Sequence, residues 1–360
     1  MGTLKTSLEE LQHLAKERTV KTQTIEYDLE TLVKKIKKDV IKLNPDYQRR
    51  HRWNNEISSR LIESLILNIP IPFVYISQDV DVDDEIEDGH ARYSVIDGQQ
   101  RLTAIYDFFE NKYPLTGLEV LEKLNESYYK DLPPFLIRRL EERSIRCLRI
   151  DSTLDQQVKY DIFERLNSGS VKLEAQELRN ATCRGKFNEL IKVLSKSSDY
   201  RDLISLSEAR EKKMEGEELI LRYFSLTHED GYKDYKSGFK KFLTTKMVDF
   251  NNFNDAQLVS MEKEFKDIIA FVKDMANGDK PFAKYRYVDG KLEFMSNFNA
   301  AVFDAVMYLS KLAIIYNKKV NLQDIRNLFS DAEFFSSCEG SVNDISKIIT
   351  RITKAAELVR

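Results

Sequence analysis

The sequence has few of the residues that build disulfide frameworks, zinc sites or membrane spans. Three Cys and four His occur among 360 residues, and the three Cys lie far apart. This usage excludes a disulfide framework and a Cys-based zinc site, and it fits a reducing cytosol. No stretch approaches the roughly 18 apolar residues of a membrane helix, and residues 1–18 lack the apolar core of a signal peptide. We therefore expect a soluble, cytoplasmic protein that does not engage a membrane.

The chain also lacks an excess of charge of either sign. Its formal net charge is -3, with 32% charged and 42% hydrophobic residues. The balance excludes a global attraction to nucleic acid, so any DNA contact must use a local basic patch. The apolar content is enough for a packed core, and the length fits two domains or one large one.

Strand and helix patterns divide the chain unevenly. Apolar runs typical of strands occur at 71–76, 93–96 and 145–150, with amphipathic helices between them. After Arg184 and Gly185 the strand signals nearly vanish and helical periodicity dominates, for example at 219–226, 239–247, 261–275 and 294–312. We expect an α+β fold with a charged lead-in at 1–23, a domain with a small mixed sheet at 24–185, and an all-helical domain at 186–360.

The most informative stretch runs from Val95 to Ile105. An apolar run ends in Asp97 and Gly98, a polar cluster follows, and then apolar residues recur at helical spacing. This pattern predicts a strand, a tight turn and a helix. Glycine lets the backbone approach a ligand closely, and a helix N-terminus beside an arginine is suited to phosphate. The alternative, an ordinary turn with a capping aspartate, does not explain three consecutive long polar side chains.

Two further segments of the N-terminal half carry more polar residues than a fold needs. At 44–53, arginines alternate with Tyr47 and Trp53, which favours either contact with phosphates and bases or a basic surface turn over core aromatics. We expect Trp53 to be packed, and Asn54 to cap the next helix. The other segment runs from Phe163 to Asn180. Glu177 and Arg179, two positions apart on a helix, point to different faces and should do different jobs. Helix caps and a surface ion pair are the structural alternative.

These three segments, in this order, carry a resemblance. The chain reads Asn-Pro-x-Tyr-Gln-Arg, then Ile-Asp-Gly-Gln-Gln-Arg-Leu-Thr, then Phe-x-Arg-Leu-Asn-x-Gly with Glu-Leu-Arg-Asn. The order resembles the N-terminal domain of GmrSD-type modification-dependent restriction enzymes, a branch of the ParB/sulfiredoxin fold, over residues 24–185. The three boxes are similar to those of ParB proteins, except that Gln99 and Gln100 stand where ParB has an acidic residue and an arginine.

The resemblance implies a module that binds and hydrolyses a nucleoside triphosphate with Mg²⁺ (or Mn²⁺), in a bacterial restriction or antiviral defence system. Positioning and charge neutralisation are most of what phosphoryl transfer asks of a protein. In that interpretation the catalytic residues are Asp97, Gln99, Gln100 and Arg101. The nucleotide ligands are Tyr47, Gln48, Arg49, Gly98, Arg101, Arg165 and Asn167, and the metal ligands are Asp97, Glu164 and Asn167.

Many relatives carry a His-Asn-His nuclease half, which needs a histidine base and metal ligands. After His90 this chain has only His228, so we expect cleavage, if any, from a partner protein or from the N-terminal domain itself. Two alternatives stay open: a metal-dependent DNA-nicking nuclease, and a non-catalytic DNA-binding or regulatory scaffold. The expected partners are a nucleotide, DNA, a nuclease or other restriction-system protein, and a second copy of the chain.

The helical half contains one basic and aromatic stretch, from Tyr232 to Lys246. Its lysines are candidate contacts to the DNA backbone, and we name Lys236, Lys240 and Lys241 as the DNA-binding residues. The alternative is an amphipathic helix with a lysine-rich exposed face. Phe294 to Leu309 forms a strong helical stripe, which predicts a core helix.

Overall fold

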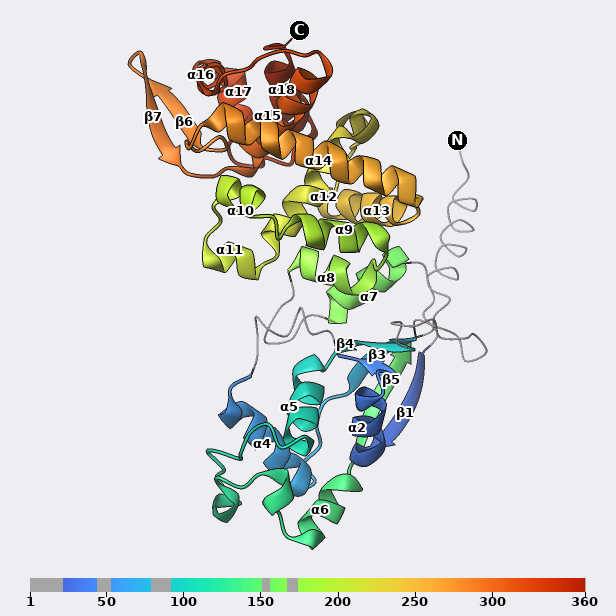
Figure 1. Cartoon of the computed structure of the whole chain (residues 1–360). Coiled ribbons are helices and arrows are strands. Elements are labelled where there is room, and N and C mark those ends of the chain that lie inside the picture. The colour runs from blue at the N-terminus through green and yellow to red at the C-terminus, as the bar shows by residue number, and fades with distance from the viewer. Residues whose placement is uncertain (1–21, 44–52, 79–91, 151–155, 167–173, 360) are drawn as a thin grey trace, which may run out of the picture. The chain divides into compact units, whose positions relative to one another are not determined.

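The computed structural model describes residues 22–43, 53–78, 92–150, 156–166 and 174–359. The chain divides into two compact units, residues 1–172 and residues 173–360 (Figure 1). The sequence prediction put the domain boundary near residue 185, whereas the boundary between the compact units precedes the helix that begins at Ala175. Each unit is described by itself.

The first unit is built on a five-stranded mixed sheet in the order β1-β5-β3-β4-β2. β1 (Thr22–Asp28) runs antiparallel to β5 (Ser144–Ile150), which is parallel to β3 (Val74–Gln78). β4 (Tyr93–Asp97) is antiparallel to β3 and parallel to the short β2 (Ile41–Lys42). The strands predicted at 93–96 and 145–150 are confirmed, and the one predicted at 71–76 begins later, at Val74.

Helices pack against one face of this sheet, where Val74, Val95 and Cys147 belong to the same core as Leu102 and Ile105. The helices of the unit are α2 (Leu29–Lys37), α4 (Asn55–Ile66), α5 (Gln99–Phe109), α6 (Pro134–Glu141) and α7 (Gln156–Leu166), with short 3₁₀ turns η1 (Glu122–Leu124) and η2 (Tyr129–Asp131).

Local sequence explains where two of these helices begin. Asp28 caps α2 by accepting from Thr31 N at 2.7 Å, and Asn54 caps α4 by accepting from Ile57 N at 2.8 Å. Both residues prefer this position because a short side-chain oxygen satisfies a free N–H of the first turn. The predicted cap at Asn54 is confirmed. Trp53 packs against the core of the unit, as predicted.

The second unit is mostly helical, which confirms the α+β class with a helical C-terminal part. Its helices are α8 (Ala175–Thr182), α9 (Lys186–Leu194), α10 (Ser198–Ile204), α11 (Glu208–Lys212), α12 (Glu215–Thr227), α13 (Phe239–Asn251), α14 (Asp255–Ala276), α15 (Ala300–Ile315), α16 (Leu322–Asn327), α17 (Ala332–Ser337) and α18 (Ile345–Ala356), with 3₁₀ turns η3 (His228–Lys233) and η4 (Leu328–Ser330).

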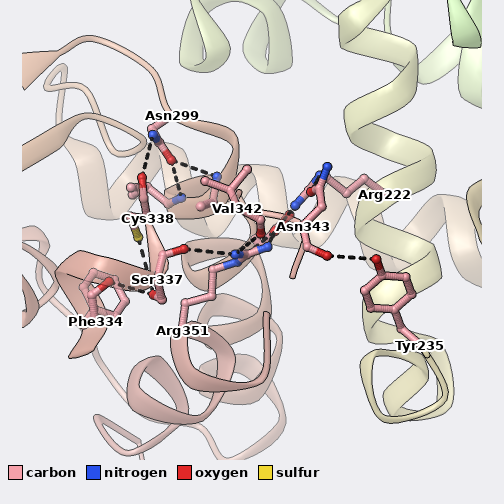
Figure 2. Close-up of polar contacts among 12 residues, drawn as sticks. Arg222, Tyr235, Asn299, Phe334, Ser337, Cys338, Val342, Asn343 and Arg351 are labelled. Atoms are coloured by element: carbon pink, nitrogen blue, oxygen red, sulfur yellow. Dashed lines mark hydrogen bonds and ion pairs between the residues drawn. The ribbon is translucent and has the colours of Figure 1, made fainter. Parts of the chain in front are cut away.

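A buried ion network joins three helices of this unit. The Asp304 carboxylate on α15 accepts from the guanidinium groups of Arg222 on α12 and Arg351 on α18, and all three side chains are buried. Figure 2 shows that Arg222 also donates to Asn343, and that Arg351 donates to the carbonyl oxygens of Ser337 and Val342. Buried charges persist only when they are paired and hydrogen-bonded. The network therefore ties α12, α15 and α18 to the end of α17 and to the loop that follows it.

Two details of this unit differ from the sequence prediction. A two-stranded hairpin, β6 (Lys284–Val288) and β7 (Lys291–Ser296), interrupts the helices. The helix predicted from Phe294 begins at Ala300, after the cap residue Asn299, whereas Phe294 lies on β7 with an exposed ring. Phe294 and Phe298 match a helical spacing by coincidence, because Phe294 lies on β7 and Phe298 lies in the loop between β7 and α15. Within the described ranges, no helix is long and apolar enough to cross a membrane.

Candidate functional site

The candidate site is the turn that leads from β4 into α5. β4 is buried until its last residue, Asp97, and Gly98 then takes the left-handed conformation with φ 93° and begins α5. No side chain caps the first turn of α5 by a hydrogen bond. The predicted strand, tight turn and helix are confirmed. The backbone N–H groups at the start of α5, which no side chain caps, therefore point toward the space beside the turn, and they favour negative charge there.

Gly98 is required here on two grounds. Its positive φ disfavours any residue with a side chain. In addition, a Cβ at this position would lie 2.9 Å from Cγ2 of Val74 and 3.3 Å from Nη2 of Arg101. Val74 is fully buried in β3 between β4 and β5. The close packing of the turn on β3 therefore depends on the absence of a Cβ.

Arg101 holds two parts of the unit together. Its Nη1 donates to the carbonyl oxygens of Pro72 and, at 3.1 Å, Phe73, just before β3 begins. Its Nη2 donates to Oδ2 of Asp97 at 2.8 Å. Only 12% of the Arg101 side chain is exposed. The guanidinium thus satisfies two carbonyl groups that precede β3, and it fixes the orientation of the Asp97 carboxylate.

Asp97 keeps one oxygen open to a ligand. Oδ2 accepts from Arg101, and 44% of the side chain is exposed. Oδ1 has no hydrogen-bond partner among the residues that the structure describes. A carboxylate at a strand end, held by an arginine and beside an uncapped helix N-terminus, can accept a proton, a water molecule or a cation.

The two glutamines of the turn differ in their surroundings. Gln100 Oε1 accepts from the backbone N–H of Trp53 at 3.1 Å, so it fastens the chain before α4 to the first turn of α5. Gln99 is buried in that first turn. Cys147, on β5, lies near Arg101 of α5. Burial raises the pKa of the Cys147 thiol to about 12, and the Arg101 charge lowers it by a smaller amount. Burial thus favours the protonated thiol over the nucleophilic thiolate at Cys147.

The other predicted site residues are only partly visible. Tyr47, Gln48, Arg49 and Asn167 lie outside the described residues. Glu164 and Arg165 are exposed on α7, and α7 approaches β4. Because most of the first polar segment lies outside the described residues, the three-segment pocket stays a prediction.

The last part of the third segment is structural. Glu177 accepts from the Glu174 N–H at 2.7 Å and so caps its own helix, α8. Arg179 is fully buried in the second unit, where it donates to Thr244, to Glu218 and to the Lys240 carbonyl oxygen. The expectation that these two residues do different jobs is confirmed. The structural alternative holds for the cap, but its surface ion pair is wrong for Arg179, which is fully buried, pairs with Glu218 and anchors α8 to α12 and α13.

Sequence reasoning missed the acceptors of Arg101 and a buried acid of the same unit, Glu63. The carbonyls of Pro72 and Phe73 carry no signal in side-chain patterns, although two prolines within three residues mark an extended segment without regular backbone pairing. Glu63 on α4 is buried and accepts from the N–H groups of Val120 at 2.9 Å and Leu121 at 2.7 Å. Glu63 lies six positions after Ile57, where the helical pattern of α4 predicts a solvent-facing side chain. The sequence pattern therefore did not indicate that Glu63 is buried and accepts these hydrogen bonds.

Metal and DNA candidates can be assessed in the same way. Within the ranges that the structure describes, no group of three or more His, Cys, Asp and Glu side chains could hold a metal ion. Lys236 is exposed before α13, and Lys240 and Lys241 are exposed in its first turn. The aromatic rings of Tyr232, Tyr235 and Phe239 are buried in the core. Those rings cannot stack on bases. The lysines alone remain as candidate backbone contacts.

Residues 29–183 match the family model described as GmrSD restriction endonuclease, N-terminal domain. The match begins at α2 and ends just after α8, and it includes the β4–α5 turn. It confirms the family predicted from the three polar segments, and it indicates a component of a restriction or phage-defence system. Neither a curated protein nor a solved structure matches the chain.

Proposed function

We propose that this chain, whose residues 29–183 belong to the GmrSD restriction endonuclease N-terminal domain family, binds and hydrolyses a nucleoside triphosphate as a component of a restriction or phage-defence system that acts on or near DNA. The observation that carries the proposal is the β4–α5 turn, where Asp97 stands beside an uncapped helix N-terminus with Oδ1 open.

The turn supplies groups of both signs that phosphoryl transfer uses. Backbone N–H groups at the start of α5 suit phosphate oxygens, because the helix dipole favours negative charge there. Asp97 Oδ1 suits a cation or a water molecule. Mg²⁺ in such sites is bound through one or two carboxylates together with phosphate oxygens, so the lack of a three-residue cluster in the described chain does not disfavour it.

In this proposal Asp97, with Glu164 and Asn167, would hold Mg²⁺ (or Mn²⁺). The ion, when bound, would neutralise charge on the phosphate oxygens. Gly98 lets the backbone approach the phosphates, and Arg101 keeps Asp97 oriented through the bond at 2.8 Å. Tyr47, Gln48, Arg49 and Arg165 would contact the nucleotide from other directions.

Calorimetric titration with nucleoside triphosphates in Mg²⁺ tests the proposal. We expect Asp97→Ala and Arg101→Ala to weaken binding relative to the wild type. Arg60→Gln is a matched control, because Arg60 forms exposed ion pairs with Glu56 and Glu119 in the same unit. Equal affinity in the wild type and both turn variants would contradict the site, and absence of binding to any nucleotide would contradict the function.

A metal-dependent nuclease is a second candidate, and the family description, which names an endonuclease, favours it. The same Asp97 carboxylate would serve there, since metal-assisted phosphodiester cleavage also needs an open acidic ligand. Incubation with modified and unmodified DNA in Mg²⁺ or Mn²⁺ distinguishes the candidates. Cleavage that Asp97→Asn abolishes would favour the nuclease, and nucleotide hydrolysis without cleavage would favour the first proposal.

A further inference from the structure

The β6–β7 hairpin of the second unit presents an apolar surface that its own chain covers only in part within the described residues. The hairpin projects beside the helices, with β6 toward η4 and β7 on the outer side (Figure 1). Cross-strand pairs Tyr285–Phe294 and Tyr287–Leu292 form one apolar face. Tyr285 packs on Phe329, but Tyr287 is 51% exposed and Phe294 is 56% exposed.

The outer edge of β7 is also open. β7 pairs with β6 alone in the described part of the chain. Asp289 and Gly290 both have positive φ, so they form the two-residue loop that closes on a hydrogen-bonded pair, Val288–Lys291. Alternation along an antiparallel ladder then directs the backbone groups of Leu292 and Phe294 away from β6. Proteins usually guard such an edge with lysine or proline, and these two positions carry neither.

The charges of the hairpin argue against nucleic acid as the occupant. Arg286 donates through both Nε and Nη2 to Glu293 across the hairpin, and Lys284 is paired with Glu339 at 2.8 Å. Contact with phosphates requires free cations. Lys291 is the one cation of the hairpin without an ion pair among the described residues. A single such cation beside exposed aromatic side chains is more typical of a surface that meets protein than of one that follows a phosphate backbone.

We propose that β7 pairs with β7 of a second copy of this chain, antiparallel and centred on Leu292. In this register Lys291 of each chain faces Glu293 of the other. Lys291 has no ion pair among the described residues, and Oε1 of Glu293 has no partner there. Each Phe294 meets Gly290 of the other chain, beside which a Cβ would find nothing within 4 Å. The loop glycine therefore leaves room for the Phe294 ring of the other chain.

The two-fold arrangement places the same groups on both sides, as an isologous interface requires. It joins the two hairpins into a four-stranded sheet, which relieves the marginal stability of an isolated hairpin. β6 lies against η4 of the same unit, so its outer edge is less open than that of β7. The β7 edge is self-complementary in charge in the register centred on Leu292.

Sedimentation equilibrium of the full chain tests the proposal. We expect the wild type to dimerise, and Lys291→Glu and Glu293→Lys each to weaken self-association by roughly tenfold or more, because each reversal sets like charges opposite one another twice. An equimolar mixture of these two variants should dimerise again, since each reversed residue then faces its complement. Phe294→Ser should weaken the dimer, whereas Tyr316→Ser, an exposed aromatic at the end of α15, should not.

A wild type that is monomeric at its highest soluble concentration would overturn the proposal. So would a dimer that tolerates both charge reversals, or variants whose mixture does not recover. Far-UV circular dichroism of each variant checks that the hairpin substitutions leave the fold intact. DNA binding by a monomeric wild type that Phe294→Ser abolishes would assign the same face to nucleic acid and would also overturn it.

Discussion

Replacement of Gly98 by alanine tests how tightly the β4–α5 turn packs on the sheet. The added Cβ would lie 2.9 Å from Cγ2 of Val74, which is closer than such carbon atoms approach, and 3.3 Å from Nη2 of Arg101. Val74 cannot move aside easily, because it is fully buried and its strand pairs with β4 and β5. Alanine must also adopt φ near 93°.

These two effects set the expected magnitude. The left-handed conformation costs a residue with a Cβ about 1–2 kcal/mol relative to glycine. Overpacking of a core contact costs roughly a further 1–3 kcal/mol. We therefore expect Gly98→Ala to lower the free energy of unfolding of the first unit by roughly 2–5 kcal/mol, a large part of the stability of an ordinary domain.

The chain provides its own probe for this measurement. Trp53 is its only tryptophan, packs against the core of the first unit, and donates its backbone N–H to Gln100 in the turn itself. Urea unfolding followed by Trp53 fluorescence therefore reports on the first unit. Circular dichroism, recorded in parallel, is weighted toward the many helices of the second unit.

Gly117→Ala is the matched control. Gly117 lies in the same unit and has φ 66°, and an added Cβ would lie 2.7 Å from Cγ of Glu56. The Glu56 side chain is half exposed and can swing away. The loss of stability in this variant should be limited to the conformational cost of about 1–2 kcal/mol. Equal losses in the two variants would refute the packing argument, as would a failure of Val74→Ala to reduce the cost of Gly98→Ala.

Three further results are expected. Asp304→Ala leaves two guanidinium groups buried without their carboxylate. It should lower the unfolding free energy of the second unit by about 3–5 kcal/mol, measured from the circular dichroism transition. Arg286→Gln, at an exposed pair, should change that free energy by less than about 1 kcal/mol, and similar effects of the two variants would contradict the buried network. Burial lowers the pKa of His228 below its usual 6.5, so the unfolded chain takes up this proton first, and the unfolding free energy should fall as pH drops below about 6.5. His228→Phe should remove that part of the pH dependence, and an unchanged pH profile would mean that His228 is not the group responsible. Changing Lys236, Lys240 and Lys241 to glutamine should reduce the slope of log affinity for DNA against log salt by about 0.9 for each phosphate that a lysine no longer neutralises, measured by fluorescence anisotropy, and weaker binding at an unchanged slope would argue against phosphate binding there.

The sequence predicts those parts of the fold that depend on local pattern. The strand ending at Asp97, the helix from Gln99 and the cap at Asn54 all follow from periodicity and from side chains that act within a few residues. The hairpin at 284–296 escaped because Phe294 and Phe298 match helical spacing with the residues after them. Only the Asp289-Gly290 pair signalled a two-residue turn, and flanking exposed residues break the alternation expected of a strand.

Long-range polar contacts set the second limit on sequence reasoning. Arg179 stands in a polar segment beside Asn180 and Glu177, and its composition fits a ligand site as well as a structural one. In the structure its guanidinium reaches Thr244 and the carbonyl of Lys240, more than sixty positions along the chain. No local pattern indicates such a distant acceptor. The family match extends to residue 183 and so includes this anchor, although α8 packs in the second unit.

The same reasoning applies within the turn. A glycine followed by two glutamines and an arginine suggests four groups directed at a ligand, yet each visible contact is internal. Gly98 makes room for Val74, Gln100 accepts from Trp53, and Arg101 donates to the carbonyls at 72 and 73. These contacts bind the chain before α4, the chain before β3 and the end of β4 to one helix start. These contacts satisfy the neighbouring polar groups and leave Oδ1 of Asp97 without a hydrogen-bond partner among the described residues. The chemistry proposed for the turn depends on that oxygen together with the backbone N–H groups at the start of α5, which no side chain caps.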